Sequence, residues 1–223
     1  MKWITLLLTS SVGKKVVMAL TGLFLISFLV VHCAINALIF VDDGGVVFSH
    51  WAHFMGTNPV IRTIEIVLVA GFLIHILQGL LLWKQNRNSR PVRYGYSSPE
   101  KGSKWYSRSM TLFGTLILLF LVIHTSNFWI PNRTNQFRFG EELNLYQMIM
   151  DTFQNPWEVL IYLFGCISLF WHLLHGFNSA FQSLGINHIK YNKLIHLSGF
   201  TFSVIVSVIF AAMPISVYFH LIG

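Results

Sequence analysis

Long apolar runs separated by shorter polar segments are the dominant pattern of this chain. Five runs reach the ~20 mostly apolar residues that a helix needs to cross a lipid bilayer. They cover about residues 16–41, 60–83, 109–130, 157–181 and 194–221. The pattern predicts an all-α integral membrane protein with a bundle of five transmembrane helices, and a single membrane-anchor domain over residues 1–223.

The composition excludes an ordinary soluble domain. Hydrophobic residues make up 54% of the chain and charged residues only 10%, whereas a soluble domain has about 25% charged residues. The net charge of +7 does not indicate a nucleic-acid partner, because the basic residues lie between the apolar runs and form no stripe on a soluble face. Such positions are typical of residues that fix the orientation of a membrane protein.

The basic residues are distributed unequally across the predicted bundle. Twelve of the fifteen lysines and arginines fall on one side: before the first run, between the second and third, and between the fourth and fifth. Most acidic residues fall on the other side. The positive-inside rule then predicts a cytoplasmic N-terminus and a C-terminus outside. The largest basic segment, Lys84–Arg108, is interpreted either as a solvated loop or as a docking surface for a soluble partner.

Four histidines lie deep within the first four runs, one in each: His32, His75, His124 and His172. At a rise of about 1.5 Å per residue, His32 and His124 lie roughly 25 Å from the inner edge of the membrane. His75 and His172 lie roughly 15 Å from that edge. The depths predict an outer and an inner layer, each with two rings from alternate helices.

An imidazole within hydrocarbon needs a partner. A single buried histidine is more often hydrogen-bonded in a core, but four at matched depths favour a cofactor. Two neutral imidazoles that face each other across a bundle suit the two axial positions of a haem iron. Two layers therefore suit two haem b groups, one above the other, which would carry electrons across the membrane.

Two glycines support this interpretation. Gly79 follows His75 by four residues, and Gly176 follows His172 by four, so each glycine lies one turn away on the same helix face. Glycine there lets a flat macrocycle approach the backbone, although close packing of helices is an equally good explanation. The shared His-x-x-x-Gly pattern selects His172 as the ligand over His175, which lies in the same run.

Three residues are candidates for a quinone site. Glu65 is the carboxylate that lies furthest inside an apolar run, which suggests a role in quinone protonation. It also lies near enough to the end of its run to reach water or Arg62 instead. His53, in the loop above the outer layer, and Asn36, one turn after His32, are weaker candidates.

Several short segments occur along the chain in a recognisable order. They are His32 followed by Asn36, AHFM at 52–55, EIVLVAGFLIHILQG at 65–79, FWHLLHGFN at 170–178 and LGI at 184–186. With these segments and five apolar runs, the chain resembles the cytochrome b (b558-type) membrane anchor of type B succinate:menaquinone oxidoreductases and quinol:fumarate reductases. The resemblance covers nearly the whole chain.

The resemblance implies a location in the bacterial inner (cytoplasmic) membrane and a place in the respiratory chain. It implies a proximal haem b held by His75 and His172, and a distal haem b held by His32 and His124. A flavoprotein with covalent FAD and an iron–sulfur protein would dock on the cytoplasmic face and carry the succinate and fumarate chemistry. Menaquinone would react near the distal haem, which makes this chain the quinone-reactive subunit.

Two alternatives remain open. Dihaem cytochrome b anchors of other quinone-linked dehydrogenases usually take ligands from fewer helices, with two ligands on one helix. One histidine on each of four helices favours the succinate or fumarate enzyme. A proton-coupled transporter with a histidine relay is the second alternative, but transporters usually show more spans, internal repeats and intramembrane acids.

Overall fold

The computed structural model describes residues 10–88, 109–186 and 188–222. In this part of the chain, five helices are long and apolar enough to cross a membrane. They are Ser11–Phe40, Pro59–Asn88, Met110–Phe139, Pro156–Ser183 and Ile189–Tyr218. The predicted all-α fold with five membrane-spanning helices is thus confirmed. Residues 89–108, most of the segment interpreted as a docking surface, lie outside the described residues.

The helices extend beyond the apolar runs that predict them. The first consists of α2 (Ser11–Ala37) and the short η1 (Leu38–Phe40), and Oγ of Ser10 caps it by accepting from the backbone N–H of Gly13. The second, α4 (Pro59–Asn88), continues through Lys84 and Arg87. Hydropathy marks only the part of a helix that lies in hydrocarbon, whereas backbone hydrogen bonding continues into the polar residues on either side.

The third helix is interrupted. It consists of α6 (Met110–His124), the π-helical segment η2 (Thr125–Trp129) and α7 (Ile130–Phe139). A π segment adds a residue to the turn and is frequent at functional sites. Here it follows directly on His124.

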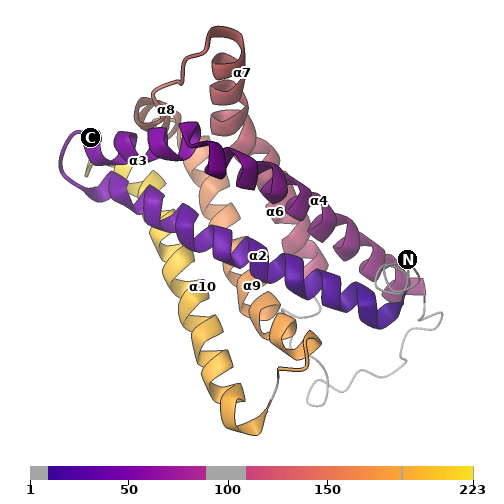
Figure 1. The fold of residues 1–223 in the computed structure, drawn as a ribbon. Helices are drawn as coiled ribbons and strands as arrows, with labels where there is room; N and C mark the ends of the chain where they lie inside the picture. Colours follow the sequence, from indigo (N-terminus) through magenta and orange to yellow (C-terminus); the bar gives the residue numbers. More distant parts are fainter. Residues whose placement is uncertain (1–9, 89–108, 187, 223) are drawn as a thin grey trace.

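Two helices occupy the middle of the molecule (Figure 1). α2 packs against α4, α9 (Pro156–Ser183) and α10 (Ile189–Tyr218), and α9 packs against α6 and α10. α4 and α6 lie on the flanks and touch each other at only a few positions. α4 consequently exposes many large apolar side chains, among them Ile66, Leu73 and Leu77, which suits a helix surrounded by lipid.

Short helices close one end of the bundle, called here the capped end. They are α3 (Val46–Thr57), α7 and α8 (Leu145–Thr152). Phe48 of α3, Ile149 of α8 and Val217 of α10 share one buried apolar cluster there. Gly45 precedes α3 at φ 81°, a left-handed conformation that favours glycine, and the carboxylate of Asp43 accepts from the N–H of Gly45 and Val47.

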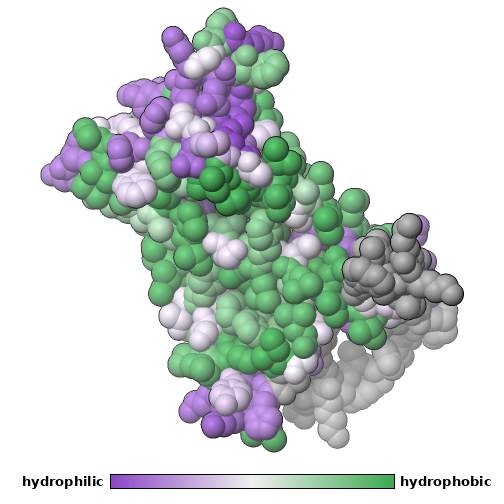
Figure 2. Space-filling view, in the orientation of Figure 1, coloured by the Kyte–Doolittle hydropathy of each residue, from purple (hydrophilic) through white to green (hydrophobic). Residues whose placement is uncertain are grey.

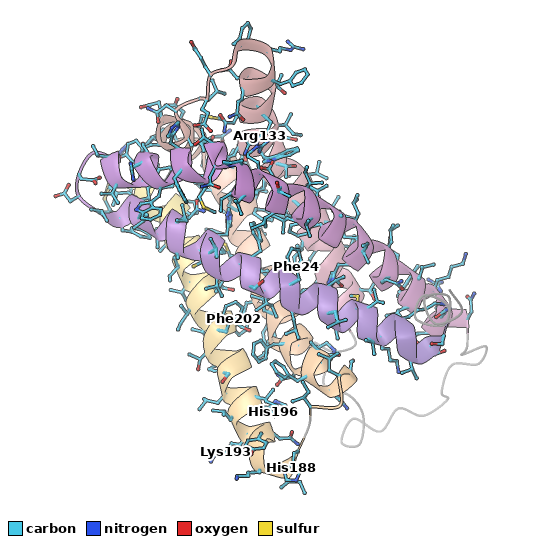
Figure 3. The ribbon with its side chains drawn as sticks, in the orientation of Figure 1. Phe24, Arg133, His188, Lys193, His196 and Phe202 are labelled. Atoms are coloured by element: carbon cyan, nitrogen blue, oxygen red, sulfur yellow. The ribbon has the colours of Figure 1, made fainter. Side chains whose placement is uncertain are left out.

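The opposite ends of the long helices are together called the basic end, and in Figure 1 those of α2 and α4 lie apart from that of α10. They carry Lys14, Lys15, Lys84, Arg87, Lys190 and Lys193. In Figure 3, His188, Lys193 and His196 lie at this end of α10, while Arg133 lies at the capped end. Figure 2 shows a largely hydrophobic surface between the two ends, as a lipid bilayer requires.

Candidate functional site

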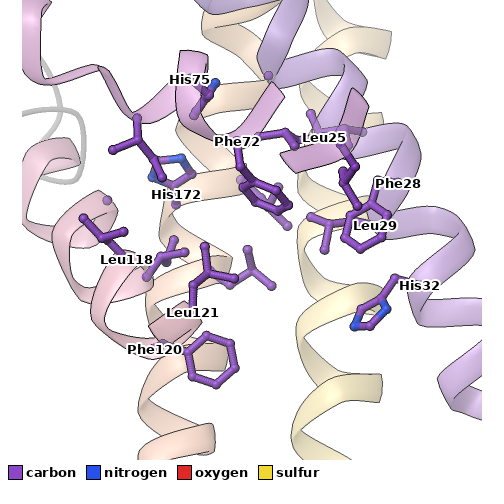
Figure 4. Close-up of a pocket in the computed structure, with 18 of the residues that line it drawn as sticks. Leu25, Phe28, Leu29, His32, Phe72, His75, Leu118, Phe120, Leu121 and His172 are labelled. Atoms are coloured by element: carbon purple, nitrogen blue, oxygen red, sulfur yellow. The ribbon is translucent and has the colours of Figure 1, made fainter. Parts of the chain in front are cut away.

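A cavity of about 2500 Å³ lies between α2, α4, α6 and α9. A single drug-sized molecule fills a pocket of ~300–1,000 Å³, so this cavity has room for more than one large ligand. Apolar side chains form most of its wall. All four deep histidines line it, and Figure 4 shows three of them.

The histidine rings meet in two pairs. The basic-end pair joins His75 of α4 to His172 of α9, with ring centroids 6.2 Å apart and planes at 68°. The cap-end pair joins His32 of α2 to His124 of α6, with centroids 5.8 Å apart and planes at 88°. Each pair brings together two helices that are not neighbours in the sequence.

These distances fit a metal ion between the rings. Two imidazoles that bind one ion from opposite sides place their centroids roughly 6 Å apart, because each metal–nitrogen bond is about 2 Å long. Edge-to-face packing of two rings gives similar distances, so the cavity and the groups behind the rings must also be considered.

The deep histidine pairs are not by themselves a complete ligand set for a bare metal ion. Within the described residues, no group of three or more His, Cys, Asp or Glu side chains converges on one point. Two imidazoles alone leave the remaining positions of a metal ion open. A haem supplies four nitrogens of its own and requires only two axial ligands, so the donor set fits this cofactor.

Two glycines lie directly against the rings of the basic-end pair. A Cβ added to Gly22 of α2 would lie 3.4 Å from Cε1 of His75, and one added to Gly114 of α6 would lie 3.6 Å from Cε1 of His172. Glycine at these positions lets the neighbouring helix approach the edge of each ring. The sequence did not single out either residue.

The glycines that the sequence did single out have different neighbours. A Cβ on Gly79 would lie 3.5 Å from the Cε methyl of Met18, and one on Gly176 would lie 3.7 Å from that of Met110. All four of these residues line the cavity. Their closest contacts are therefore with methionines, and both glycines also serve helix packing.

A repeated spacing would have revealed the missed glycines. The same pattern, Met-x₃-Gly-x₅-Phe-x₃-His, occurs in the first and third long helices. Its residues are Met18, Gly22, Phe28 and His32 in α2, and Met110, Gly114, Phe120 and His124 in α6. In both copies the phenylalanine stacks on the histidine, with ring centroids 5.1 Å and 5.6 Å apart. The two halves of the site are thus built alike.

Polar groups behind the rings differ among the four histidines. Nδ1 of His75 lies 3.1 Å from the hydroxyl of Thr21, and Nδ1 of His124 lies 3.4 Å from the hydroxyl of the buried Tyr162. Nδ1 of His172 is buried and, in the part of the chain that the structure describes, has no hydrogen-bond partner.

Asn36 and His53, two of the quinone-site candidates, lie in different surroundings. Nδ2 of Asn36 donates to the carbonyl oxygen of His32 and lies 3.4 Å from Nδ1 of the same ring. Asn36 lines the large cavity, so it stays close to the cap-end pair. His53 lines a smaller pocket instead, where its Nδ1 lies 2.6 Å from a carboxylate oxygen of Glu142.

Glu65, the third candidate, is ion-paired. Its carboxylate accepts from Nη2 of Arg133 at 2.9 Å and from the indole N–H of Trp129 at 2.6 Å, and it also pairs with Arg62. These contacts join α4 to η2 and α7 at the capped end. The arrangement favours the interpretation of Glu65 as an ion-paired acid over that of a quinone proton donor.

The five apolar helices and the histidine-lined cavity between four of them define the class: this chain is a multi-pass membrane protein. Comparison of the chain with protein-family models, with curated proteins and with solved structures found no match.

Proposed function

We propose that this chain is the dihaem cytochrome b membrane anchor of a succinate dehydrogenase or fumarate reductase. It would pass electrons between an iron–sulfur subunit and menaquinone. The observation that carries the proposal is the pairing of four histidines, one from each of four membrane-spanning helices, at two levels of one cavity. Two separate axial pairs are what two haem b groups require.

In this proposal the two pairs have distinct tasks. His75 and His172 hold the haem nearer the basic end, and His32 and His124 hold the haem nearer the capped end. Bound haem supplies reversible one-electron transfer at its iron. The residues of the chain keep the imidazoles in place and exclude water. In Figure 4 the apolar side chains of Phe72 and Leu29 lie between the basic-end pair and His32, and Leu25, Leu118 and Leu121 line the same cavity around them.

The charge distribution supports an orientation with the basic end in the cytoplasm and the C-terminus outside. In that orientation the flavoprotein, with its FAD, and the iron–sulfur protein dock on the face that carries Lys84, Arg87, Lys190 and Lys193. The basic-end pair is then the one nearer the soluble partners. The membrane is the bacterial inner membrane.

Menaquinone would react near the cap-end pair. The cavity extends there past Asn36, Met55 and Trp129, and the sparse contact between α4 and α6 leaves a side through which a lipid-soluble quinone would enter. Oxidation of succinate to fumarate on the partner releases two electrons and two protons. Menaquinone takes up the same number to become menaquinol, and fumarate reduction reverses both changes.

An affinity-tagged chain, expressed in its native membrane and purified in mild detergent, tests this function. The proposal expects a flavoprotein and an iron–sulfur protein to co-purify, and the complex to couple succinate oxidation to the reduction of a menaquinone analogue. It expects His32→Ala to abolish quinone reduction while succinate oxidation with a soluble dye continues. Co-purification with a hydrogenase or formate dehydrogenase instead would support the other class of anchor.

A further inference from the structure

The hydroxyl of Thr21 contacts the ring of His75 from behind. Its Oγ1 on α2 lies 3.1 Å from Nδ1 of His75 on α4. His75 lines the cavity and Thr21 does not, so the hydroxyl meets the side of the ring that faces the neighbouring helix. The contact therefore leaves the cavity side of the imidazole accessible.

The proton of this hydroxyl is already used within α2. Oγ1 of Thr21 lies 2.9 Å from the carbonyl oxygen of Val17 and 3.1 Å from that of Met18, and it donates its single proton to them. With its proton on these carbonyls, the oxygen accepts from His75. In this arrangement Nδ1 of the ring carries the proton, and Nε2 keeps the lone pair that a metal ion needs.

The copy of the repeated pattern in α6 offers His172 no hydroxyl like that of Thr21. In the repeated pattern, the residue before the glycine is Thr21 in α2 and Phe113 in α6. Phe113 is buried and stacks on Trp171 with ring centroids 6.4 Å apart. Nδ1 of His172 correspondingly has no hydrogen-bond partner among the described residues. The basic-end pair thus combines one ring whose Nδ1 meets a hydroxyl with one whose Nδ1 has no partner in the described part of the chain.

We infer that Thr21 is a positioning residue of the basic-end site. It fixes the tautomer and the orientation of His75 and makes this imidazole the more basic ligand of the pair. A hydrogen bond from the outer ring nitrogen raises the basicity of a metal-bound histidine, and hydrogen bonding around an axial ligand sets the reduction potential of a haem. The inference rests on the proposed function, because it assumes that haem binds to His75.

The test compares Thr21→Val, which keeps the shape of the side chain, with Thr21→Ser, which keeps the hydroxyl. Thr63→Val is the matched control, because Thr63 on α4 makes the same kind of bond to a carbonyl oxygen within its own helix. The full-length chain is purified from membranes with its haems. Potentiometric titration then gives the midpoint potential of each haem, and electron paramagnetic resonance reports the relative orientation of the axial rings.

Thr21→Val should shift the potential of one haem to a more positive value and change its resonance, while Thr21→Ser and Thr63→Val resemble the wild type. The affected haem is identified as the one that His75→Ala removes. Loss of that haem in Thr21→Val but not in Thr21→Ser also supports the inference.

Unchanged potentials and resonances in Thr21→Val would overturn the inference and leave the proposed function intact. Equal changes in Thr21→Val and Thr21→Ser would overturn it as well, since packing rather than the hydroxyl would then be responsible. A wild-type chain that contains no haem would instead remove the proposed function itself and, with it, the role of Thr21.

Discussion

Gly22 of α2 lies against the ring of His75 on α4, so close that an added Cβ would be 3.4 Å from Cε1. An alanine fits at this distance with little adjustment, whereas a longer side chain would push the ring toward the cavity. Two helices that run in opposite directions are thus brought together at one imidazole, and the small size of Gly22 sets how closely α2 approaches that ring.

The first prediction follows from this contact. Gly22→Leu should remove the haem of the basic-end pair, because the added side chain displaces His75, and Gly22→Ala should retain both haems. Gly22→Ala is also the matched control, since it adds only a Cβ at 3.4 Å from the ring of His75. Haem content per chain measures the outcome. Two haems in Gly22→Leu would show that the ring position is not essential for binding.

Glu65 provides the second prediction. Glu65→Gln should lower the thermal stability of the detergent-solubilised protein by about 1–3 kcal/mol, because it weakens charged hydrogen bonds to Arg133 that are largely shielded from solvent. Glu141→Gln, an exposed acid at the same end, should change stability by less than about 0.5 kcal/mol. Thermal unfolding followed by circular dichroism measures both. Full stability with loss of quinone reduction in Glu65→Gln would restore Glu65 as a proton donor.

A third prediction compares Gly45, which precedes α3, with Gly140, which follows the end of α7. Gly140→Ala should cost about 1–2 kcal/mol, because Gly140 has a left-handed backbone at φ 74° but open space around it. Gly45→Ala should cost clearly more, because its Cβ would also collide with the ring of Tyr146. Thermal unfolding of both variants gives the comparison. Equal losses of stability would mean that α8 moves aside freely, which would contradict a rigid capped end.

Charge reversal at the basic end gives the fourth prediction. Lys190→Glu combined with Lys193→Glu should reduce the amount of flavoprotein and iron–sulfur protein that co-purifies with the chain, because both residues lie on the proposed docking face. Arg138→Glu at the capped end is the control and should leave the complex unchanged. Equal recovery of the partners in both variants, across a range of salt concentrations, would place the docking surface elsewhere.

The sequence was sufficient for the number and approximate position of the long helices, because hydrocarbon imposes a minimum apolar length on each one. The depth of each histidine was also sufficient to group the four rings in two layers, since helix rise is constant. The role of those rings as haem ligands stays a prediction. The apolar pattern did not predict that α2, α4 and α10 extend into the polar sequence beside the apolar runs.

Which residues contact the histidine rings depends on how each helix is rotated about its own axis. Hydropathy does not encode this rotation. Gly79 and Gly176 were chosen because they follow a histidine on its own helix, but the glycines against the rings, Gly22 and Gly114, come from neighbouring helices. For Glu65 the sequence suggested Arg62 as a partner but not Arg133, which is far away in the sequence and reaches it only after the π segment η2. Contacts between helices determine both which glycines lie against the rings and which arginine pairs with Glu65.

The most direct test of the account is the haem content of the purified chain, measured from the reduced-minus-oxidised spectrum and by extraction of the haem. Two haem b per chain are predicted, with one remaining in His172→Ala, one remaining in His32→Ala and two remaining in His175→Ala. A purified, folded chain with no b-type absorption band, or with haem content that His172→Ala leaves unchanged, would contradict the central claim.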